Sequence, residues 1–484
     1  MDRQIHEKGK EGFQETPREL GVYVELSVEI AKHIESIRFE DIPESSLGAA
    51  KQLILDSLGV AIAGSTGEGV REAVDLMKEW EGTPESTVIC HRLKLPAISA
   101  AFANSVMIHA RDFDDTHDGA VIHTSVTVLP TIMALAEKKG GVSGKTFLTA
   151  FVLGVDLSAR LGLAISGGLG FNERETRWIR TAVCGIFGAT AAACKIEEMQ
   201  EKEINNALGI SLTQVAGTRQ AVSDSALVKR FQPGFMTRSA ILSALLARKG
   251  VTGCREVFEG KYGYFNLYWN GSYVREALTA GLGRRFEVEQ ISLKPYPCCR
   301  YVHGPIDAIL ACIKKHAIHP DRVDEVNIHL VKHPFFDVVS RPFSIRGNPI
   351  VDAQFSIPYV VVSALLDGYI SLDTFESKKV MERVEHPLLK RVKVWIDREL
   401  KSPTSLGPVT VEVKMKSGEQ YCETVENLKG DPRNRMTKEE CKEKFVRCAA
   451  FSLEPISKKH LEKIIKTVFS LEAVKNTNEL VNLL

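Results

Sequence analysis

The chain has 484 residues, of which 44% are hydrophobic and 25% are charged, with 62 basic side chains against 61 acidic ones. A formal net charge of +1 gives no overall field that would gather nucleic acid or an anionic membrane, so any affinity for anions must come from a local cluster. A chain of this length exceeds what one compact core usually holds, which predicts two domains or one large domain with an insertion.

The N-terminal segment, residues 1–19, has the character of a flexible, solvated lead-in. It carries charges throughout and lacks the apolar stretch of a signal peptide. No run of about eighteen uninterrupted apolar residues occurs in the chain, so we expect no membrane span. The ten cysteines show no CxxC pair and no metal-ligand spacing, and several lie among apolar or small residues, as buried free thiols do. These features predict a cytoplasmic protein.

Residues 20–288 are expected to form the first part of a helical domain. Apolar residues at three-to-four spacing predict a helix from Pro43 to Ser65, which ends in Gly-Ser. Small residues would let such helices pack closely, and an apolar character on all sides suggests burial. Similar Ala- and Leu-rich stretches recur at 100–110, 126–140, 144–165, 184–196, 203–217 and 236–250.

The hydrophobic pattern changes after about Phe286. Alternating, valine-rich segments at 323–331, 391–400 and 409–425 predict strands, and a helical segment at 353–368 lies between them. Thr437, with Glu440 three residues later, predicts a capped helix start. We therefore expect a mainly α protein with an α+β insertion: a large all-helical domain, a smaller α+β lid domain at 289–428, and a return to the helical domain at 429–484.

Residues 111–125, RDFDDTHDGAVIHTS, concentrate acidic and imidazole groups before an apolar segment. Such groups bind several divalent ions, but the spacing matches no zinc or EF-hand pattern. Aspartates in a turn also cap helices and bind backbone amides. Histidines beside carboxylates have raised pKa values and a held tautomer, which suit acid–base chemistry. The residues concerned are Asp112, Asp114, Asp115, His117, Asp118 and His123.

Two other stretches hold basic groups in a restrained backbone. Lys229 and Arg230 precede a Pro-Gly pair that we expect to turn into a helix, and a helix start with nearby cations suits a carboxylate or phosphate. Lys294 lies in the stretch ISLKPYPCCRYVHGPIDAIL, with Arg300 and His303 after it. Taken alone, the basic residues of either stretch are also compatible with solvated or structural charges that bind no ligand. No P-loop or GxGxxG motif accompanies them.

Together these stretches resemble the MmgE/PrpD family, which includes 2-methylcitrate dehydratase, cis-aconitate decarboxylase and iminodisuccinate epimerase. The similarity follows the chain in order through LILDSLGVAIAGS, AAFANSVMIHARDFDDTHDGAVIHTS, TAVCGIFGATAAA, VKRFQPG, LKPYPCCRYVHGPIDA, AQFSIPYVVVSALLDG and KGDPRNRMTKEECKEKF. The resemblance implies a large all-α domain with an α+β lid inserted near residue 290. It also implies a homodimer whose active site, between helical domain and lid, uses no metal and no organic cofactor.

The resemblance carries specific residues with it. Asp112, Thr116 and His123 match the D-x-D-D-T…H-x-S loop of the family, Lys229 the lysine before its Pro-Gly or Ala-Gly turn, and Lys294 the lysine of its K-P-Y-P motif. Two lysines can hold a carboxylate by charge-assisted hydrogen bonds. They also stabilise the charge that develops when a proton α to that carboxylate leaves, and a histidine can move the proton.

One position departs from the family pattern. Many members have F-H-P-T where this chain has W-I-R-T, so Ile179 replaces a histidine that is a candidate acid–base partner in dehydratases and decarboxylases. His117 could substitute for it, or the reaction could be one that asks less of a leaving-group acid, such as epimerisation. Arg180 could instead add a contact to a carboxylate.

We therefore expect a cofactor-independent lyase for a small di- or tricarboxylate, first a 2-methylcitrate dehydratase-like enzyme that removes a proton α to a carboxylate and eliminates water. An epimerase, isomerase or decarboxylase of such acids is the alternative, and a non-catalytic binding protein is the third hypothesis. The residues expected to be catalytic are His123, Asp112, His117 and Lys294, and those expected to bind substrate are Thr116, Lys229, Arg180 and His303.

Overall fold

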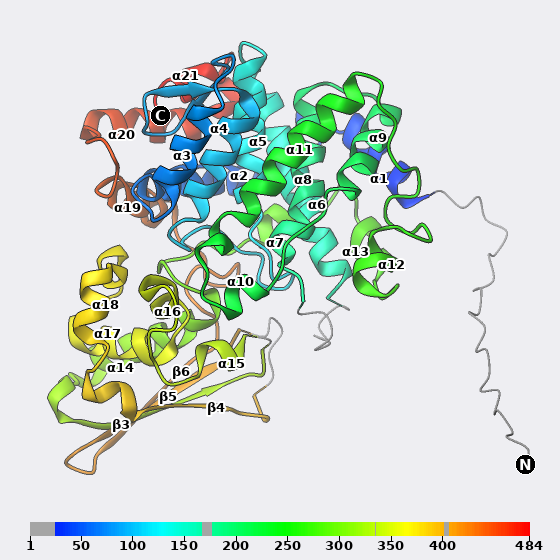
Figure 1. Ribbon diagram of the computed structural model, residues 1–484. Coiled ribbons are helices and arrows are strands. Elements are labelled where there is room, and N and C mark those ends of the chain that lie inside the picture. The colour runs from blue at the N-terminus through cyan, green and yellow to red at the C-terminus, as the bar shows by residue number, and fades with distance from the viewer. Residues whose placement is uncertain (1–24, 167–176, 334, 401–405) are drawn as a thin grey trace, which may run out of the picture.

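The computed structural model describes residues 25–166, 177–333, 335–400 and 406–484, so the lead-in predicted at 1–19 lies outside the described residues. Helices gathered in one body form the upper part of the molecule in Figure 1, and a four-stranded sheet with its own helices forms a smaller body below them. The change of periodicity after Phe286 thus predicts the fold class correctly, a mainly helical protein with a second domain of sheet and helices.

Two apolar cores correspond to these bodies. The larger core draws on residues 26–293 and again on 436–483, whereas the smaller core is built almost wholly from residues 298–428. The chain therefore leaves the helical body once and later returns to it. The two crossings lie side by side, because the Leu293 N–H donates a hydrogen bond of 3.1 Å to the carbonyl of Gly430.

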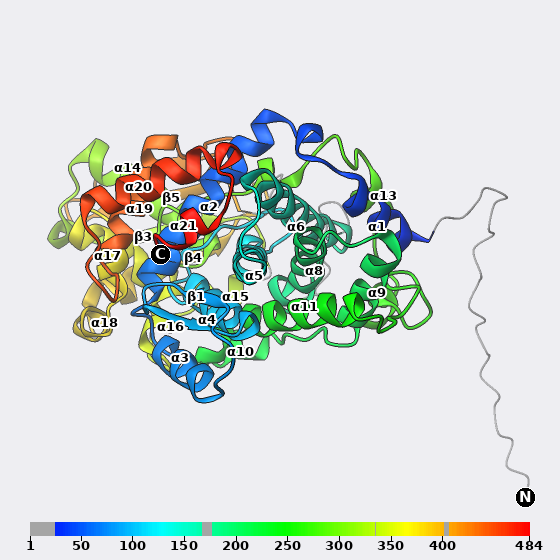
Figure 2. The ribbon, with the colours of Figure 1, turned by 90° about the horizontal axis from the view of Figure 1, so that it is seen from above.

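The helical body is assembled from segments of both ends of the chain. Its helices before the crossing are α1 (Leu26–Ser36), α2 (Glu44–Gly64), α3 (Val70–Glu79), α4 (Ala97–His109), α5 (Ser125–Lys138), α6 (Gly144–Ala164), α7 (Arg180–Val183), α8 (Gly185–Ile196), α9 (Glu201–Leu212), α10 (Gln220–Ser223), α11 (Gln232–Arg248), α12 (Tyr264–Trp269) and α13 (Arg275–Thr279). Those after it are α19 (Lys438–Ala449), α20 (Lys458–Phe469) and α21 (Asn478–Val481), which lie beside the earliest helices in Figure 2.

Helices α2 and α6, with 21 residues each, are the longest in the described part of this body. By length and composition alone both are apolar enough to cross a membrane, but 72% and 94% of their most apolar windows are buried within the structure. Burial in the core therefore accounts for their composition. Small residues allow the close packing that the sequence predicts: a Cβ added to Gly188 of α8 would lie 1.9 Å from the hydroxyl oxygen of Ser158 on α6.

The smaller body is a mixed sheet with strand order β4-β3-β5-β6. Strand β3 (Val323–Leu330) pairs in parallel with β4 (Val392–Ile396) and antiparallel with β5 (Val409–Met415), which forms a hairpin with β6 (Gln420–Val425). Alternate residues of β5 are buried, as a sheet with one covered face requires. The helices of this body are α14 (His303–His316), α15 (Phe336–Val339), α16 (Pro349–Gln354), α17 (Ile357–Asp367) and α18 (Ser377–Arg383).

Of the helix starts and turns predicted from local sequence, one is confirmed and one is wrong. Thr437 caps α19 as predicted, its hydroxyl accepting from the Glu440 N–H at 3.1 Å. The Pro-Gly pair after Arg230 does not form a turn before a helix; both residues lie in the first turn of α11, where proline is tolerated because its missing N–H has no helical partner. A short hairpin of β1 (Ser86–Val88) and β2 (Leu93–Leu95) was not predicted.

Candidate active site

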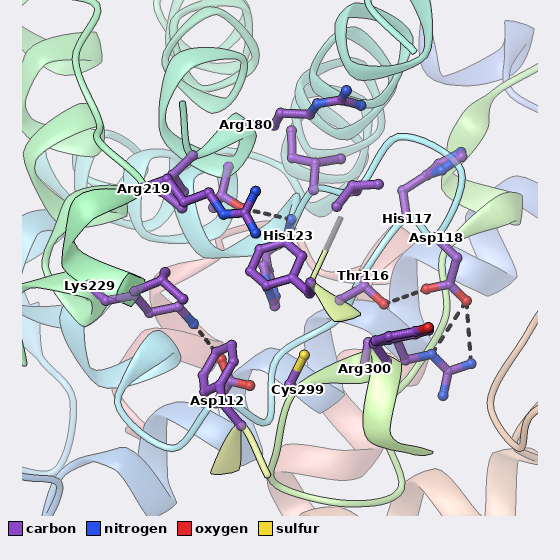
Figure 3. Close-up of a pocket in the computed structure, with 18 of the residues that line it drawn as sticks. Asp112, Thr116, His117, Asp118, His123, Arg180, Arg219, Lys229, Cys299 and Arg300 are labelled. Carbon is purple, nitrogen blue, oxygen red and sulfur yellow. Dashed lines mark hydrogen bonds and ion pairs between the residues drawn. The ribbon is translucent and has the colours of Figure 1, made fainter. Parts of the chain in front are cut away.

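A cavity of ≈ 120 Å³ lies where the loop after α4 faces the first residues of the smaller body (Figure 3). Its lining comes from six segments of the chain, around residues 109–123, 178–181, 219–229, 294–301, 333–355 and 406. Five basic side chains line it against two carboxylates in the described part of the chain, which favours a negatively charged occupant. The basic residues are Arg180, Arg219, Lys229, Lys294 and Arg300.

The loop after α4 is almost entirely buried and is held by its own side chains. Asp115 organises the start of α5: its carboxylate accepts from the Thr124 hydroxyl at 2.7 Å and from the N–H groups of Thr124 and Ser125 at 3.3 Å. Asp112 has a φ of +50°, a left-handed conformation that residues other than glycine adopt uncommonly. The loop is therefore a rigid, specifically shaped support, and Asp115 has the structural role that turn aspartates commonly have.

Asp112 joins the two lysines that the sequence singles out. One carboxylate oxygen binds the Lys229 ammonium and the other lies 3.2 Å from Nζ of Lys294, which also donates to the Asp112 carbonyl at 2.7 Å. Burial alone would raise the pKa of Asp112, but the two ammonium groups outweigh it and hold that pKa well below its usual range. The trio therefore keeps one excess positive charge at the cavity.

His123 belongs to a second trio, with Asp114 and His109. One oxygen of Asp114 lies 3.1 Å from Nδ1 of His123 and 2.8 Å from Nδ1 of His109, and the two rings meet edge to face at 4.8 Å. The side chain of His123 is 18% exposed, against 1% for His109 and 0% for Asp114. His123 is thus the member that can exchange a proton with a bound molecule, and Asp114 lies beside its ring.

Two members of this trio, His109 and Asp114, have shifted pKa values. Burial lowers the pKa of His109 to about 4, despite the attraction of Asp114, so this ring is neutral near pH 7. Burial alone would raise the pKa of Asp114, but the two imidazoles hold it well below its usual range. The carboxylate of Asp114 therefore stays ionised beside the two rings.

His117 lies in the cavity lining, but both of its ring nitrogens are used by the protein. Nδ1 accepts from the Ala120 N–H at 3.1 Å, which leaves the Nε2–H to donate to Glu287 at 3.2 Å. In Figure 3 the ring points away from Asp112 and Lys229. Its contacts stabilise the 117–122 turn, and the expected role of His117 in proton transfer stays a prediction.

Thr116 and Asp118 connect the loop to the smaller body. The Thr116 hydroxyl donates to Asp118 at 2.8 Å, and the same carboxylate accepts from Ser292 at 2.6 Å and from Nε of Arg300 at 3.3 Å. Thr116 and Ser292 also exchange backbone hydrogen bonds. This network aligns the two bodies on either side of the cavity.

Arg180 and His303, both expected to bind substrate, are placed differently. Arg180 lines the cavity and donates through Nη1 to the Ala120 carbonyl and to the Ser166 hydroxyl. His303 does not line it: Nδ1 lies 3.3 Å from Arg300 and Nε2 lies 3.3 Å from the Cys298 carbonyl. Burial, and then the Arg300 charge, hold the pKa of His303 well below its usual range, so a neutral ring orients Arg300 from behind.

The nitrogen and oxygen atoms of His109, Asp112 and His123 lie within 4.8 Å of one another and could hold a metal ion by ligand type. However, both oxygens of Asp112 already contact ammonium groups. A divalent ion there would bring three cations to one carboxylate. The contacts therefore favour an anion as the occupant.

Three functional candidates were missed by sequence reasoning: His109, Arg219 and Arg300. His109 ends the apolar helix α4 and carries no motif of its own. Arg219 precedes the short helix α10 in a segment without periodicity, and its guanidinium lies 4.5 Å from the Phe335 ring. Arg300 was noted in the sequence but not assigned to the site. Only the tertiary structure brings these residues to one cavity.

An interdomain cavity with paired lysines, and with a histidine beside a carboxylate, has the features of an enzyme site for an anionic molecule. The chain matches the family models "MmgE/PrpD N-terminal domain" over residues 28–277 and "MmgE/PrpD C-terminal domain" over residues 296–471. The protein therefore belongs to the MmgE/PrpD family, as its motifs indicate.

Curated relatives match along almost the whole chain. The "cis-aconitate decarboxylase-like protein oryM" of Aspergillus oryzae is 28% identical, over 95% of this chain and 97% of that protein. The "cis-aconitate decarboxylase" of Aspergillus terreus is 28% identical, over 94% of this chain and 96% of its own. The human "cis-aconitate decarboxylase" is 27% identical, over 95% of this chain and 94% of its own.

Proposed function

We propose that this protein is a carboxy-lyase that removes CO2 from a small unsaturated tricarboxylate of the cis-aconitate type. The sequence favours dehydration of a 2-methylcitrate-like acid, with epimerisation, isomerisation or decarboxylation of such acids as the alternative. Two of the relatives are named cis-aconitate decarboxylase and the third is named decarboxylase-like, so decarboxylation is now the better supported reaction. The observation that carries the proposal is the cationic trio of Asp112, Lys229 and Lys294 in the same cavity as the partly exposed His123.

The chemistry needs a place for negative charge. When the bond to a CH2-bound carboxylate breaks, CO2 leaves and its electron pair spreads over the adjacent double bond to the carbon α to another carboxylate. That carboxylate then carries enediolate-like charge, which nearby ammonium groups stabilise most in the transition state. Lys229, whose side chain is 10% exposed, is suited to contact this carboxylate. Lys294, which is buried on the other oxygen of Asp112, adds a second positive charge nearby.

The chemistry also consumes one proton, which must reach the α carbon. His123 can supply it, because its Nδ1 lies beside the ionised Asp114 and its ring reaches the cavity. No second acid is required, since CO2 leaves as a neutral molecule, whereas a departing hydroxide needs a proton. The position of Ile179, an apolar residue in the cavity lining, is compatible with a reaction that uses a single acid.

The test is to incubate the purified protein with cis-aconitate in D2O and to measure headspace CO2 and the product by NMR. We expect one CO2 for each acid consumed and one deuterium on a carbon that was vinylic. Water addition, or deuterium incorporation into unchanged acid without CO2 release, would instead indicate a hydro-lyase or an isomerase. We also propose a cytoplasmic homodimer, and light scattering on the purified protein tests its oligomeric state.

A further inference from the structure

The lining of the cavity is of two kinds. One part carries the charged trio of Asp112, Lys229 and Lys294, together with His123. Much of the rest is hydrocarbon. Ile179 contacts both apolar cores, so the wall at this point continues the interior of each body. The apolar lining residues that matter here are Val121, Ile122, Trp178, Ile179, Phe335 and Leu406.

Two of the three arginines of the lining, Arg180 and Arg300, turn their charged ends to the protein, whereas the guanidinium of the third, Arg219, lies 4.5 Å from the centre of the Phe335 ring. The guanidinium of Arg180 donates to the Ala120 carbonyl and the Ser166 hydroxyl, and that of Arg300 donates to Asp118 and to the Lys429 carbonyl. In Figure 3 the ends of both arginines point away from Lys229 and Asp112. Such residues present their carbon stems to the cavity.

This arrangement constrains the substrate. A carboxylate pressed against hydrocarbon loses its water without gaining a partner, which is unfavourable, whereas a methylene group there gains from leaving water. cis-Aconitate carries a carboxylate on each branch of its skeleton and has no alkyl branch to place beside Ile179. We propose that the preferred substrate is an alkyl-substituted homologue, in which a carbon chain replaces one hydrogen of the skeleton and lies against the wall at Ile179.

The inference rests on the proposed decarboxylation, and the bonds formed and broken in that reaction stay the same. The bond to one carboxylate breaks, CO2 departs, the electron pair moves through the double bond to the carbon α to a second carboxylate, and His123 donates a proton there. The alkyl chain takes no part in these steps. It contributes binding energy at a distance from the reacting carbons and so acts on specificity.

The experiment compares cis-aconitate with two series of homologues, which carry methyl to butyl chains on one or the other hydrogen-bearing carbon. In at least one series we expect kcat/KM for CO2 release to rise about fourfold per added methylene until the wall is covered. If unsubstituted cis-aconitate has a higher kcat/KM than every homologue of both series, the inference is wrong, although the proposed decarboxylation still stands. If no acid releases CO2, the proposed reaction fails, and the Tm shifts produced by the same acids then test the apolar wall alone.

Substitutions of Ile179 link the preference to the wall. In Ile179→Asn, a polar amide replaces hydrocarbon, so the ratio of kcat/KM for the best homologue over cis-aconitate should fall at least tenfold. The matched variant Ile179→Leu keeps an apolar wall of equal carbon content and should keep that ratio within about threefold. Equal ratios in the Asn and Leu variants would show that the alkyl chain of the substrate does not lie against Ile179.

Discussion

Lys444, on the helix that returns from the C-terminal end of the chain, donates a hydrogen bond of 2.9 Å to the backbone carbonyl of Phe113. Its ammonium also lies 3.8 Å from the centre of the Phe113 ring and 2.7 Å from a carboxylate oxygen of Asp56 on α2. Phe113 stands between Asp112 and Asp114, the two carboxylates that hold the lysines and histidines of the cavity. A buried residue outside the cavity thus supports the geometry within it.

Replacement of Lys444 by methionine should therefore affect both stability and activity. It leaves Asp56 buried without its partner, and breaking a buried pair in this way typically costs about 3–5 kcal/mol. It also removes the anchor of the Phe113 carbonyl, so kcat for CO2 release should fall more than KM changes. Urea unfolding and steady-state kinetics measure the two effects.

A double variant separates the effects of Lys444. In Asp56→Asn/Lys444→Met no buried charge is left unpaired, so most of the lost stability should return. Activity should stay low, because nothing then holds the Phe113 carbonyl. If the double variant is stable and fully active, Lys444 contributes to folding and has no positioning role.

The stability of the protein should depend on pH through His33, which lies on α1 far from the cavity lining. Burial, followed by the charges of Arg160 and Lys195, lowers the pKa of His33 from 6.5 to about 4. Between these values the unfolded chain binds a proton and the folded chain does not, so stability falls as pH drops from 6.5 to 4. The shift corresponds to about 3 kcal/mol. The unfolding free energy of His33→Gln should change less between pH 7 and pH 4.5 than that of the unchanged protein. An equal change in the two proteins would mean that His33 is not the source of the pH dependence.

The fold was predictable where local signals agree with the tertiary structure. Periodicity separated helices from strands on either side of Phe286, and Thr437 with Glu440 located a helix start. The β1–β2 hairpin was missed because its strands have three residues each and its turn places Cys90 and Arg92 at positive φ, without the glycine or asparagine that usually marks such a turn.

The site was predictable only as a set of residues, and its contacts were not. Motifs selected Asp112, Lys229 and Lys294, but 117 residues separate Asp112 from Lys229 and 182 separate it from Lys294, so no local rule pairs them. For the same reason the sequence suggested two lysines free to bind substrate, whereas the structure joins both through Asp112. His109 gave no signal because a histidine in an apolar helix is typical of a buried core position.

Substitution should distinguish the two histidines of the 111–125 segment. In His123→Gln the proton donor is lost, and kcat for CO2 release should fall at least a hundredfold, the usual contribution of a general acid. His117→Gln removes hydrogen bonds to Ala120 and Glu287 only, so its kcat should fall less than tenfold. The pH dependence of kcat measured for both variants checks the assignment. A larger loss in the His117 variant would make His117 the proton donor and would assign His123 to binding.

Lys229 should contribute to substrate binding as well as to kcat, because its side chain is 10% exposed whereas that of Lys294 is fully buried. In Lys229→Met the substrate carboxylate loses a charge-assisted hydrogen bond, and Lys294 remains to neutralise Asp112. The loss of such a bond typically amounts to about 1.5–3 kcal/mol, so KM should rise roughly ten- to a hundredfold. The exposed Lys261→Met provides the matched control, with the same change of charge and no contact with the cavity, and should leave KM unchanged.

Because the positive charge attracts anions over some distance, the KM of the unchanged protein should rise with added salt more steeply than that of Lys229→Met. Parallel salt dependence in the two proteins would mean that Lys229 serves only to hold Asp112.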